Sequence, residues 1–131
     1  MSGIQQSGIF YGNSETSHAD ILDGSSNTIM LGERSGNVFE STWTGAMIGA
    51  DFSEWRVVGW TGEPPNYEND NEVSTPHFHP FAQFNSDHAD GLSMFAFADS
   101  SVDVISKRVD FEVFHSLGTI NGRERNSRDQ F

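Results

Sequence analysis

Two short apolar runs with alternating side chains follow one another late in the chain. Residues 92–98 and 101–106 each alternate larger apolar residues with small or polar ones, and a polar dipeptide separates them. A period of two is typical of β-strands, and the polar interruption predicts a hairpin. In the second run, Ile105 falls on the same side as Asp103, so both faces carry apolar groups. We therefore expect this hairpin to be covered on both faces and to form the centre of a sheet.

Further apolar runs between turn-forming residues predict the remaining strands. We expect strands at residues 9–11, 28–33, 40–48 and 54–60. The acidic segment 63–72 carries two prolines and no basic residue. This composition predicts a surface loop.

Two short helical segments complete the pattern. One turn begins after Ser17, and a longer helix follows Asp110, whose carboxylate is suited to cap it. The apolar residues of 111–117 recur at a spacing of three, which places them on one face against the sheet, and Gly118 ends the helix. The sequence thus predicts an α+β fold, an antiparallel β-sheet with one or two short helices, in a single domain of residues 1–131.

Composition narrows the possible functions. The chain has 131 residues, 35% of them hydrophobic, with eleven Phe and three Trp, which is enough for one folded core. Its net charge of −12 disfavours nucleic acid as a partner, because phosphate binding requires clustered basic residues. No cysteine is present, so disulfides and thiol chemistry are excluded. Five of the seven basic residues follow residue 106, and this basic end on an acidic body suits contacts between copies.

The hairpin region resembles the H-X9-DG segment of the DUF1559 family, which is abundant in planctomycetes. The family pattern is approximately S-x-H-x-G-G, an apolar strand, A-D-G-S-V, and a second apolar strand ending in I-S. The matching residues are Ser86, His88, Gly91, Ala98, Asp99, Ser101, Val102, Ile105 and Ser106. Here ten residues rather than nine separate His88 from Asp99, and Ser100 replaces the glycine of the turn. Glycine supplies a positive φ in a tight turn, so Ser100 predicts either another turn type or a bulge.

A second motif with the same resemblance lies near the N-terminus. Residues 8–35 are similar to the family segment that reads I-x-D-G-T-S-N-T-I followed by G-E-R. The matching residues are Asp20, Ile21, Asp23, Gly24, Ser26, Asn27, Thr28, Gly32, Glu33 and Arg34. Residues 121–131 resemble the family's ending, which reads L-G-T-x-x-G-G-E. The resemblance covers residues 8–40 and 84–131, and two motifs in the correct order are more specific than either alone.

The resemblance implies a structural role. Members are prepilin-type proteins with an N-terminal membrane helix and an extracytoplasmic β-rich domain. This implies a pseudopilin-like globular head, located at the cell surface or in the periplasm and without catalysis. Its partners would be copies of itself or other pilin-like envelope proteins, and it would touch the membrane only through a stem helix absent here. A head without its stem is expected to expose an apolar patch.

Histidines suggest one candidate metal site. His77 and His79 are two residues apart, so on a strand they would share a face and could bind a transition metal together with His88 or Asp87. The alternative is that these histidines form hydrogen bonds with neighbouring backbone.

Short oxygen-bearing side chains suggest a second candidate. Asp23, Ser25 and Asn27 lie in one turn and could bind calcium, which prefers oxygen ligands. Such a turn can equally satisfy its own backbone through side-chain hydrogen bonds. We expect no obligatory cofactor.

His88 has two interpretations of its own. It could act as a ligand or a catalytic base, or it could be a structural latch that binds Asp99 or the Asp23 loop. We favour the latch, because a polar residue before a buried hairpin more often stabilises the backbone.

Catalysis has little support in the sequence. There is no nucleophile elbow, no cysteine and no phosphate-binding glycine loop, so we expect no enzyme. Trp43, Trp55 and Trp60 are expected in the core, or alternatively on a platform for sugar rings. The alternative function is therefore an extracytoplasmic ligand-binding module for carbohydrate or calcium.

Overall fold

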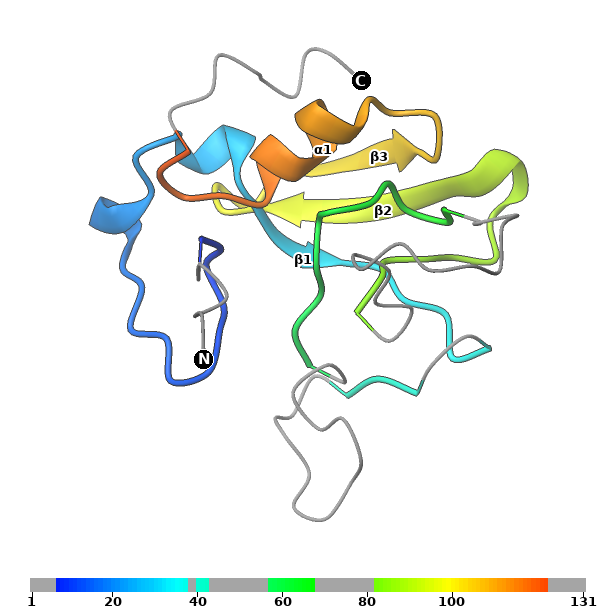
Figure 1. Cartoon of the computed structure of the whole chain (residues 1–131), viewed down its shortest axis with the longest axis horizontal. Helices are drawn as coiled ribbons and strands as arrows, with labels where there is room; N and C mark the ends of the chain where they lie inside the picture. Colours follow the sequence, from blue (N-terminus) through cyan, green and yellow to red (C-terminus); the bar gives the residue numbers. More distant parts are fainter. Residues whose placement is uncertain (1–6, 38–39, 43–56, 68–81, 123–131) are drawn as a thin grey trace.

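The computed structural model describes residues 7–37, 40–42, 57–67 and 82–122. Within these ranges it contains a three-stranded sheet, one α-helix and short 3-10 turns (Figure 1). The elements are η1 (His18–Asp20), η2 (Ser25–Asn27), β1 (Ile29–Gly32), η4 (Ala89–Gly91), β2 (Leu92–Phe97), β3 (Val102–Ser106) and α1 (Phe111–Leu117). This combination of an antiparallel sheet with one helix is consistent with the predicted α+β class.

The strands are antiparallel in the order β1-β2-β3, so β2 is the central strand of the described sheet. Ile29 pairs with Phe97, whereas Leu31 pairs with Ala96, so the register shifts by one residue at Met30. A bulge of this kind places Ile29 on one face of the sheet and Leu31 on the other. β3 pairs with β2 from Leu92↔Ser106 to Ala96↔Val102 and is an edge strand among the described residues.

The turn between β2 and β3 contains a bulge, one of the two alternatives that Ser100 predicted. The Ser100 N–H donates to the Phe97 carbonyl at 2.9 Å, and the Phe97 N–H donates to the Ser101 carbonyl at 2.9 Å. Ser100 has a φ of 70°. A three-residue loop closed by a left-handed residue matches the type I turn with a G1 bulge. Ser100 therefore adopts the conformation for which the family pattern has glycine.

The core lies between α1 and one face of the sheet, here called the inner face. Phe95 is at its centre, with edge-to-face contacts to Phe84 and Phe114 at ring-centroid distances of 5.2 and 5.5 Å. The buried cluster consists of Ile29, Phe95, Phe97, Ile105, Val109, Phe114 and Leu117. The Asp110 carboxylate accepts hydrogen bonds from the backbone N–H groups of Glu112 and Val113, which confirms the predicted cap.

The hairpin is buried on one face and not on both, which corrects the prediction that both of its faces are covered. On the opposite, outer face several apolar side chains remain exposed to between 37% and 63%: Leu31, Leu92, Met94, Val102 and Val104. The hairpin is thus covered on one side, and its second strand lies at the margin of the described sheet. The aromatic residues of β2 all point to the inner face, where α1 lies, which leaves smaller apolar side chains on the outer face.

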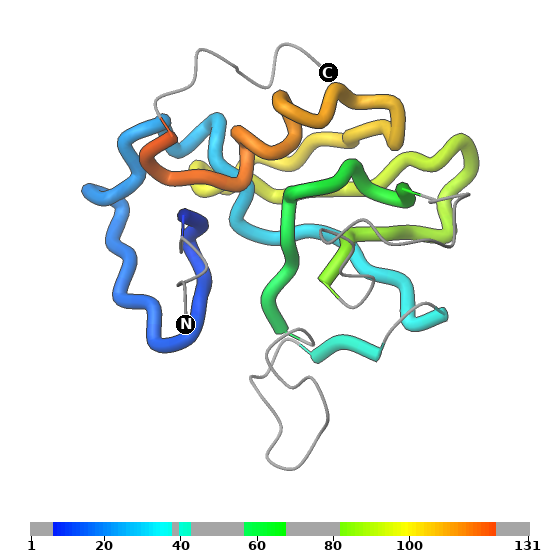
Figure 2. The backbone as a smooth tube through the Cα atoms, in the orientation of Figure 1, coloured from blue at the N-terminus to red at the C-terminus, as the bar shows by residue number. Residues whose placement is uncertain are grey.

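The segment 57–67 was also predicted differently. It crosses the inner face (Figure 2), and Glu63, Pro64 and Pro65 are buried, although the sequence predicted a surface loop there. Because proline has no backbone N–H, burying two prolines beside a sheet leaves no unsatisfied donor at these positions. Residues 57–60 form no strand, while residues 43–48 and 54–56 of the expected strands lie outside the described residues.

Two further expectations need correction. Residues 9–11 form no strand; Ile9 is buried while Phe10 is half-exposed. In α1, Phe114 and Leu117 are fully buried, but Phe111 is 46% exposed and contacts the ring of Tyr67 instead.

In the described part of the chain no helix is both long and apolar enough to span a lipid bilayer.

Candidate functional site: two junctions of the sequence motifs

Glu33 brings the two sequence motifs together at the start of β2. Its Oε1 lies 3.1 Å from Nε2 of His88, and its Oε2 accepts the backbone N–H of Met94 at 3.1 Å. The backbone of Glu33 continues the sheet, donating to the Met94 carbonyl and accepting from the Asn85 N–H. One residue thus joins the end of β1 to β2 and to the segment before it.

Neighbouring residues reinforce this first junction. Asp87 Oδ2 accepts hydrogen bonds from Ser35 Oγ at 2.9 Å and Asn37 Nδ2 at 3.0 Å. Arg34 donates through Nε to the Gln83 carbonyl and through Nη1 to Ser41 Oγ. Burial lowers the pKa of Arg34 from its usual value, because desolvation penalises the charged form. Polar residues after β1 therefore tie residues 83–88 to the sheet.

Asn66 connects the 57–67 segment to β2 and to the segment before it, a role that the sequence did not reveal. Its φ is 55°, its Oδ1 accepts the Ser86 N–H at 2.8 Å, and its Nδ2 donates to Ser93 Oγ at 3.0 Å. Ser93 is fully buried on the inner face, so its hydroxyl needs a partner there. The only hint in the sequence is an asparagine directly after two prolines, a combination that favours a turn.

A second junction lies at the other end of β2. The Asp23 carboxylate accepts Thr119 Oγ1 at 3.0 Å and the Gly122 N–H at 2.7 Å. The buried Thr28 side chain contacts the carbonyls of Gly24 and Thr119 at 3.1 and 3.3 Å. Segments 18–27 and 117–122 consequently lie side by side (Figure 2).

The β2–β3 turn reaches the same junction. The Asp99 N–H donates to the Ser25 carbonyl at 3.1 Å, and the Ala98 N–H donates to the Thr28 carbonyl at 2.9 Å. Asp99 Oδ1 accepts from the backbone N–H and the hydroxyl of Ser101. The family-pattern residues of this turn, of the 23–28 loop and of the segment after α1 therefore meet in one place.

The proposed latch residues take part in different junctions. His88 precedes β2 and contacts Glu33, whereas Asp99 follows β2 and contacts the loop of Asp23. Six strand residues between them separate the two sites by about 20 Å. Sequence reasoning missed Glu33 as the partner of His88, although it had identified Glu33 within the G-E-R match.

The candidate metal ligands are placed as follows. Among the described residues no group of three or more His, Asp or Glu side chains is arranged to hold a metal ion. The Asp23 carboxylate accepts two hydrogen bonds, while Ser25 and Asn27 lie in η2, where the Asn27 N–H donates to the Gly24 carbonyl. His77 and His79 lie outside the described residues, as do Trp43 and Trp55. Trp60 is half-buried, and its indole lies directly over Gly62.

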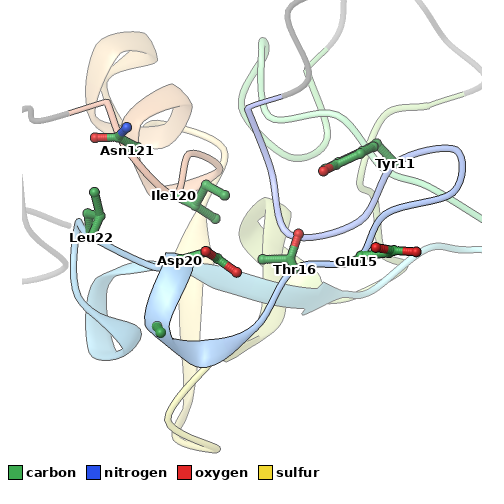
Figure 3. Close-up of a pocket in the computed structure, with 8 residues that line it drawn as sticks. Tyr11, Glu15, Thr16, Asp20, Leu22, Ile120 and Asn121 are labelled. Atoms are coloured by element: carbon green, nitrogen blue, oxygen red, sulfur yellow. The ribbon is translucent and has the colours of Figure 1, made fainter.

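A shallow cavity of about 480 Å³ opens beside η1, between the N-terminal motif and the segment after α1 (Figure 3). Its wall includes Tyr11, Glu15, Thr16, Ala19, Asp20, Leu22, Ile120 and Asn121. Ser17 donates two hydrogen bonds to Asp20, from its hydroxyl and its backbone N–H, and these lower the pKa of that carboxyl below its usual value.

A family model supports the assignment made from the motifs. The model described as "Protein of unknown function (DUF1559)" matches residues 2–112. The chain belongs to the DUF1559 family. The match also spans residues 41–83, for which the motifs gave no resemblance. It ends at residue 112, within α1, so it does not include the segment that follows this helix. No curated protein and no solved structure matches the chain.

Proposed function

We propose that this DUF1559 chain is a non-catalytic, surface-displayed head domain of the pilin-like or pseudopilin-like kind. It mediates self-assembly or contacts with other envelope proteins outside the cytoplasm. The observation that carries this proposal is what the shared motif residues contact. Glu33, His88, Asp23, Thr28 and Asp99 all bind other parts of their own chain.

Such contacts suit a scaffold. A catalytic site gathers its reactive groups, such as a general base and the donors that stabilise developing charge, around one reacting position. In the described residues, the polar groups of both junctions instead hold strand ends and loops together. A shape maintained in this way is useful for display.

The outer face of the sheet supports the self-assembly part of the proposal. Five large apolar side chains are exposed there on three adjacent strands. A contiguous exposed apolar surface of this kind often marks an interaction site. A partner or a stem helix would remove it from water.

Sedimentation velocity over a wide range of protein concentrations tests this function. We expect the weight-average sedimentation coefficient to rise with concentration, because exposed apolar surface promotes weak association. A strictly monomeric chain would contradict self-assembly. A rise in Tm with calcium that EDTA reverses would instead support a ligand-binding module.

The gene provides an independent check of the pilin-like architecture. We expect the reading frame upstream of this segment to encode a prepilin cleavage signal followed by about twenty apolar residues, the length that spans a bilayer. A reading frame without such a segment would contradict this architecture.

A further inference from the structure

We propose that two copies of the chain pair through the outer edge of β3, antiparallel to one another, about a two-fold axis at Val104. This inference rests on the self-assembly part of the proposed function and names its surface. In this register Val104 lies opposite Val104 of the second copy, and Val102 lies opposite Ser106.

The backbone of β3 is arranged for this pairing. The Phe97 N–H donates to the Ser101 carbonyl, and the Lys107 N–H donates to the Gly91 carbonyl. Because bonded residues alternate along an antiparallel pair, Asp103 and Ile105 direct their backbone groups toward β2. The backbone groups of Val102, Val104 and Ser106 therefore point outward from the sheet.

These outward groups are self-complementary. Two hydrogen bonds form between the two Val104 residues, each donating its N–H to the carbonyl of the other. Two more run from the Ser106 N–H of each copy to the Val102 carbonyl of the other. The Ser106 carbonyl already accepts the Val109 N–H at 3.0 Å, and this register leaves that bond in place.

Side chains and charge favour the same register. Val102 and Val104 are 63% and 45% exposed, and pairing places the two Val104 side chains next to each other on the outer face. Lys107 and Arg108 follow β3, whereas Asp99 precedes it. In an antiparallel pair each basic end lies beside the acidic end of the other copy, while a parallel pair would oppose like charges.

One contact limits the strength of the pair. Asp103 Oδ1 accepts the Val104 N–H at 2.9 Å. Pairing exchanges this bond for one with the second copy, so Asp103 competes with association. Protection of exposed strand edges by charged residues is common, and here it makes the pairing weak and reversible.

A single cysteine tests the register, because the chain has none of its own. Directly opposed residues of a hydrogen-bonded antiparallel pair have Cα atoms about 5.5 Å apart, within the range of a disulfide. Under mild oxidation we expect Val104→Cys to form covalent dimers about ten-fold faster than Leu31→Cys, since pairing raises the effective concentration of the thiols. Leu31 is a matched control, because it is 58% exposed on the same face but belongs to β1.

Equal rates for the two variants would overturn the proposal, and faster dimerisation of Leu31→Cys would indicate packing of the two outer faces instead. Sedimentation of two further variants separates this inference from the function itself. Val104→Pro removes an outward N–H without touching the bonds to β2, so we expect self-association to be lost. Asp103→Ala releases the same N–H, so we expect stronger association.

If Val104→Pro, with an unchanged circular dichroism spectrum, associates like the wild type, edge pairing is wrong while self-assembly stands. If the wild type is monomeric at every concentration, both are wrong. If Val104→Pro folds poorly, two tests remain. Unchanged association of Asp103→Ala would contradict pairing through the edge of β3. Equal cross-linking rates of Val104→Cys and Leu31→Cys would also contradict it.

Discussion

Individual residues adopt backbone conformations that their side chains do not all favour. Within the described ranges, the non-glycine residues with positive φ are Asn13, Asn66, Asp90 and Ser100. Asn and Asp tolerate this region through local hydrogen bonds, whereas serine has less compensation. Ser100 is exposed at the turn, so its own side chain adds little packing.

Ser100→Gly should therefore stabilise the protein, by about 0.5–1 kcal/mol, because glycine adopts a positive φ without steric cost. Urea unfolding measures the change. The control is Ser26→Gly, which lies in η2 outside the positive-φ residues and should be neutral or destabilising. Equal effects of the two substitutions would show that the turn stores no strain.

The hydrogen bonds from Ser17 to Asp20 predict a pH effect at one residue. They lower the pKa of Asp20 below its ordinary value of 3.8, and the hydroxyl of Ser17 is the largest cause. Because the folded pKa is below the unfolded one, the stabilisation is present above the unfolded pKa and is lost as the pH falls through the folded pKa. In Ser17→Ala we expect the Asp20 pKa to rise toward its ordinary value, as followed by NMR titration of the carboxyl carbon. An unchanged titration curve would contradict the effect of the Ser17 hydroxyl, and Ser17→Thr should retain the low pKa.

Elements are held together by close approaches as well as by periodic apolar faces. The ring of Phe84 lies between β1 and the 57–67 segment, so close that a Cβ on Gly32 or Gly59 would lie 2.4 or 2.1 Å from its atoms. Neither glycine has a positive φ, so space rather than backbone conformation requires them. Space also requires a glycine at Gly118, after α1, because an added Cβ would lie 1.9 Å from Thr61 Oγ1.

Gly59→Ala should destabilise the protein by about 1–3 kcal/mol, the usual cost of forcing a packed side chain to move. Gly36→Ala is the matched control, because no atom lies within 4 Å of its added methyl group. Urea unfolding followed by tryptophan fluorescence compares the two variants. A stability of Gly59→Ala equal to that of the control would mean that Phe84 yields without cost.

At the scale of the whole molecule, a few side chains connect segments that are far apart in the sequence. The bond from the Gly122 N–H to Asp23 closes a separation of 99 residues, and the contact of Thr28 with Thr119 closes one of 91. These contacts join the 23–28 segment to the end of the described chain beside the β2–β3 turn. On the outer face, in contrast, apolar side chains such as Leu31, Met94 and Val104 remain exposed.

Removal of the Asp23 carboxylate should weaken this closure. We expect Asp23→Ala to cost about 1–3 kcal/mol of global stability, because the Gly122 N–H and the Thr119 hydroxyl lose a charged acceptor. Asp23→Asn keeps one carbonyl acceptor and should cost less. Hydrogen exchange of the Gly122 amide, measured with urea unfolding, reports the local and the global effect. An unaltered exchange rate in Asp23→Ala would contradict the junction.

The sequence alone determined the local elements. Alternation located β2 and β3, the Asp110 cap located α1, and the unusual Ser100 indicated either another turn type or a bulge. Each of these signals acts over a few residues, because side-chain alternation, capping and turn conformation depend on near neighbours along the chain. The family membership also followed from such local motifs.

The tertiary structure decided which distant groups meet and which face of the sheet is buried. Local patterns could not pair His88 with Glu33, bury residues 63–65 on the inner face, or leave Val102 and Val104 exposed. The physical reason is that alternation shows only that two faces differ, while burial depends on what packs against each face. That partner comes from elsewhere in the chain, and one short helix and one crossing segment were sufficient to cover only the inner face.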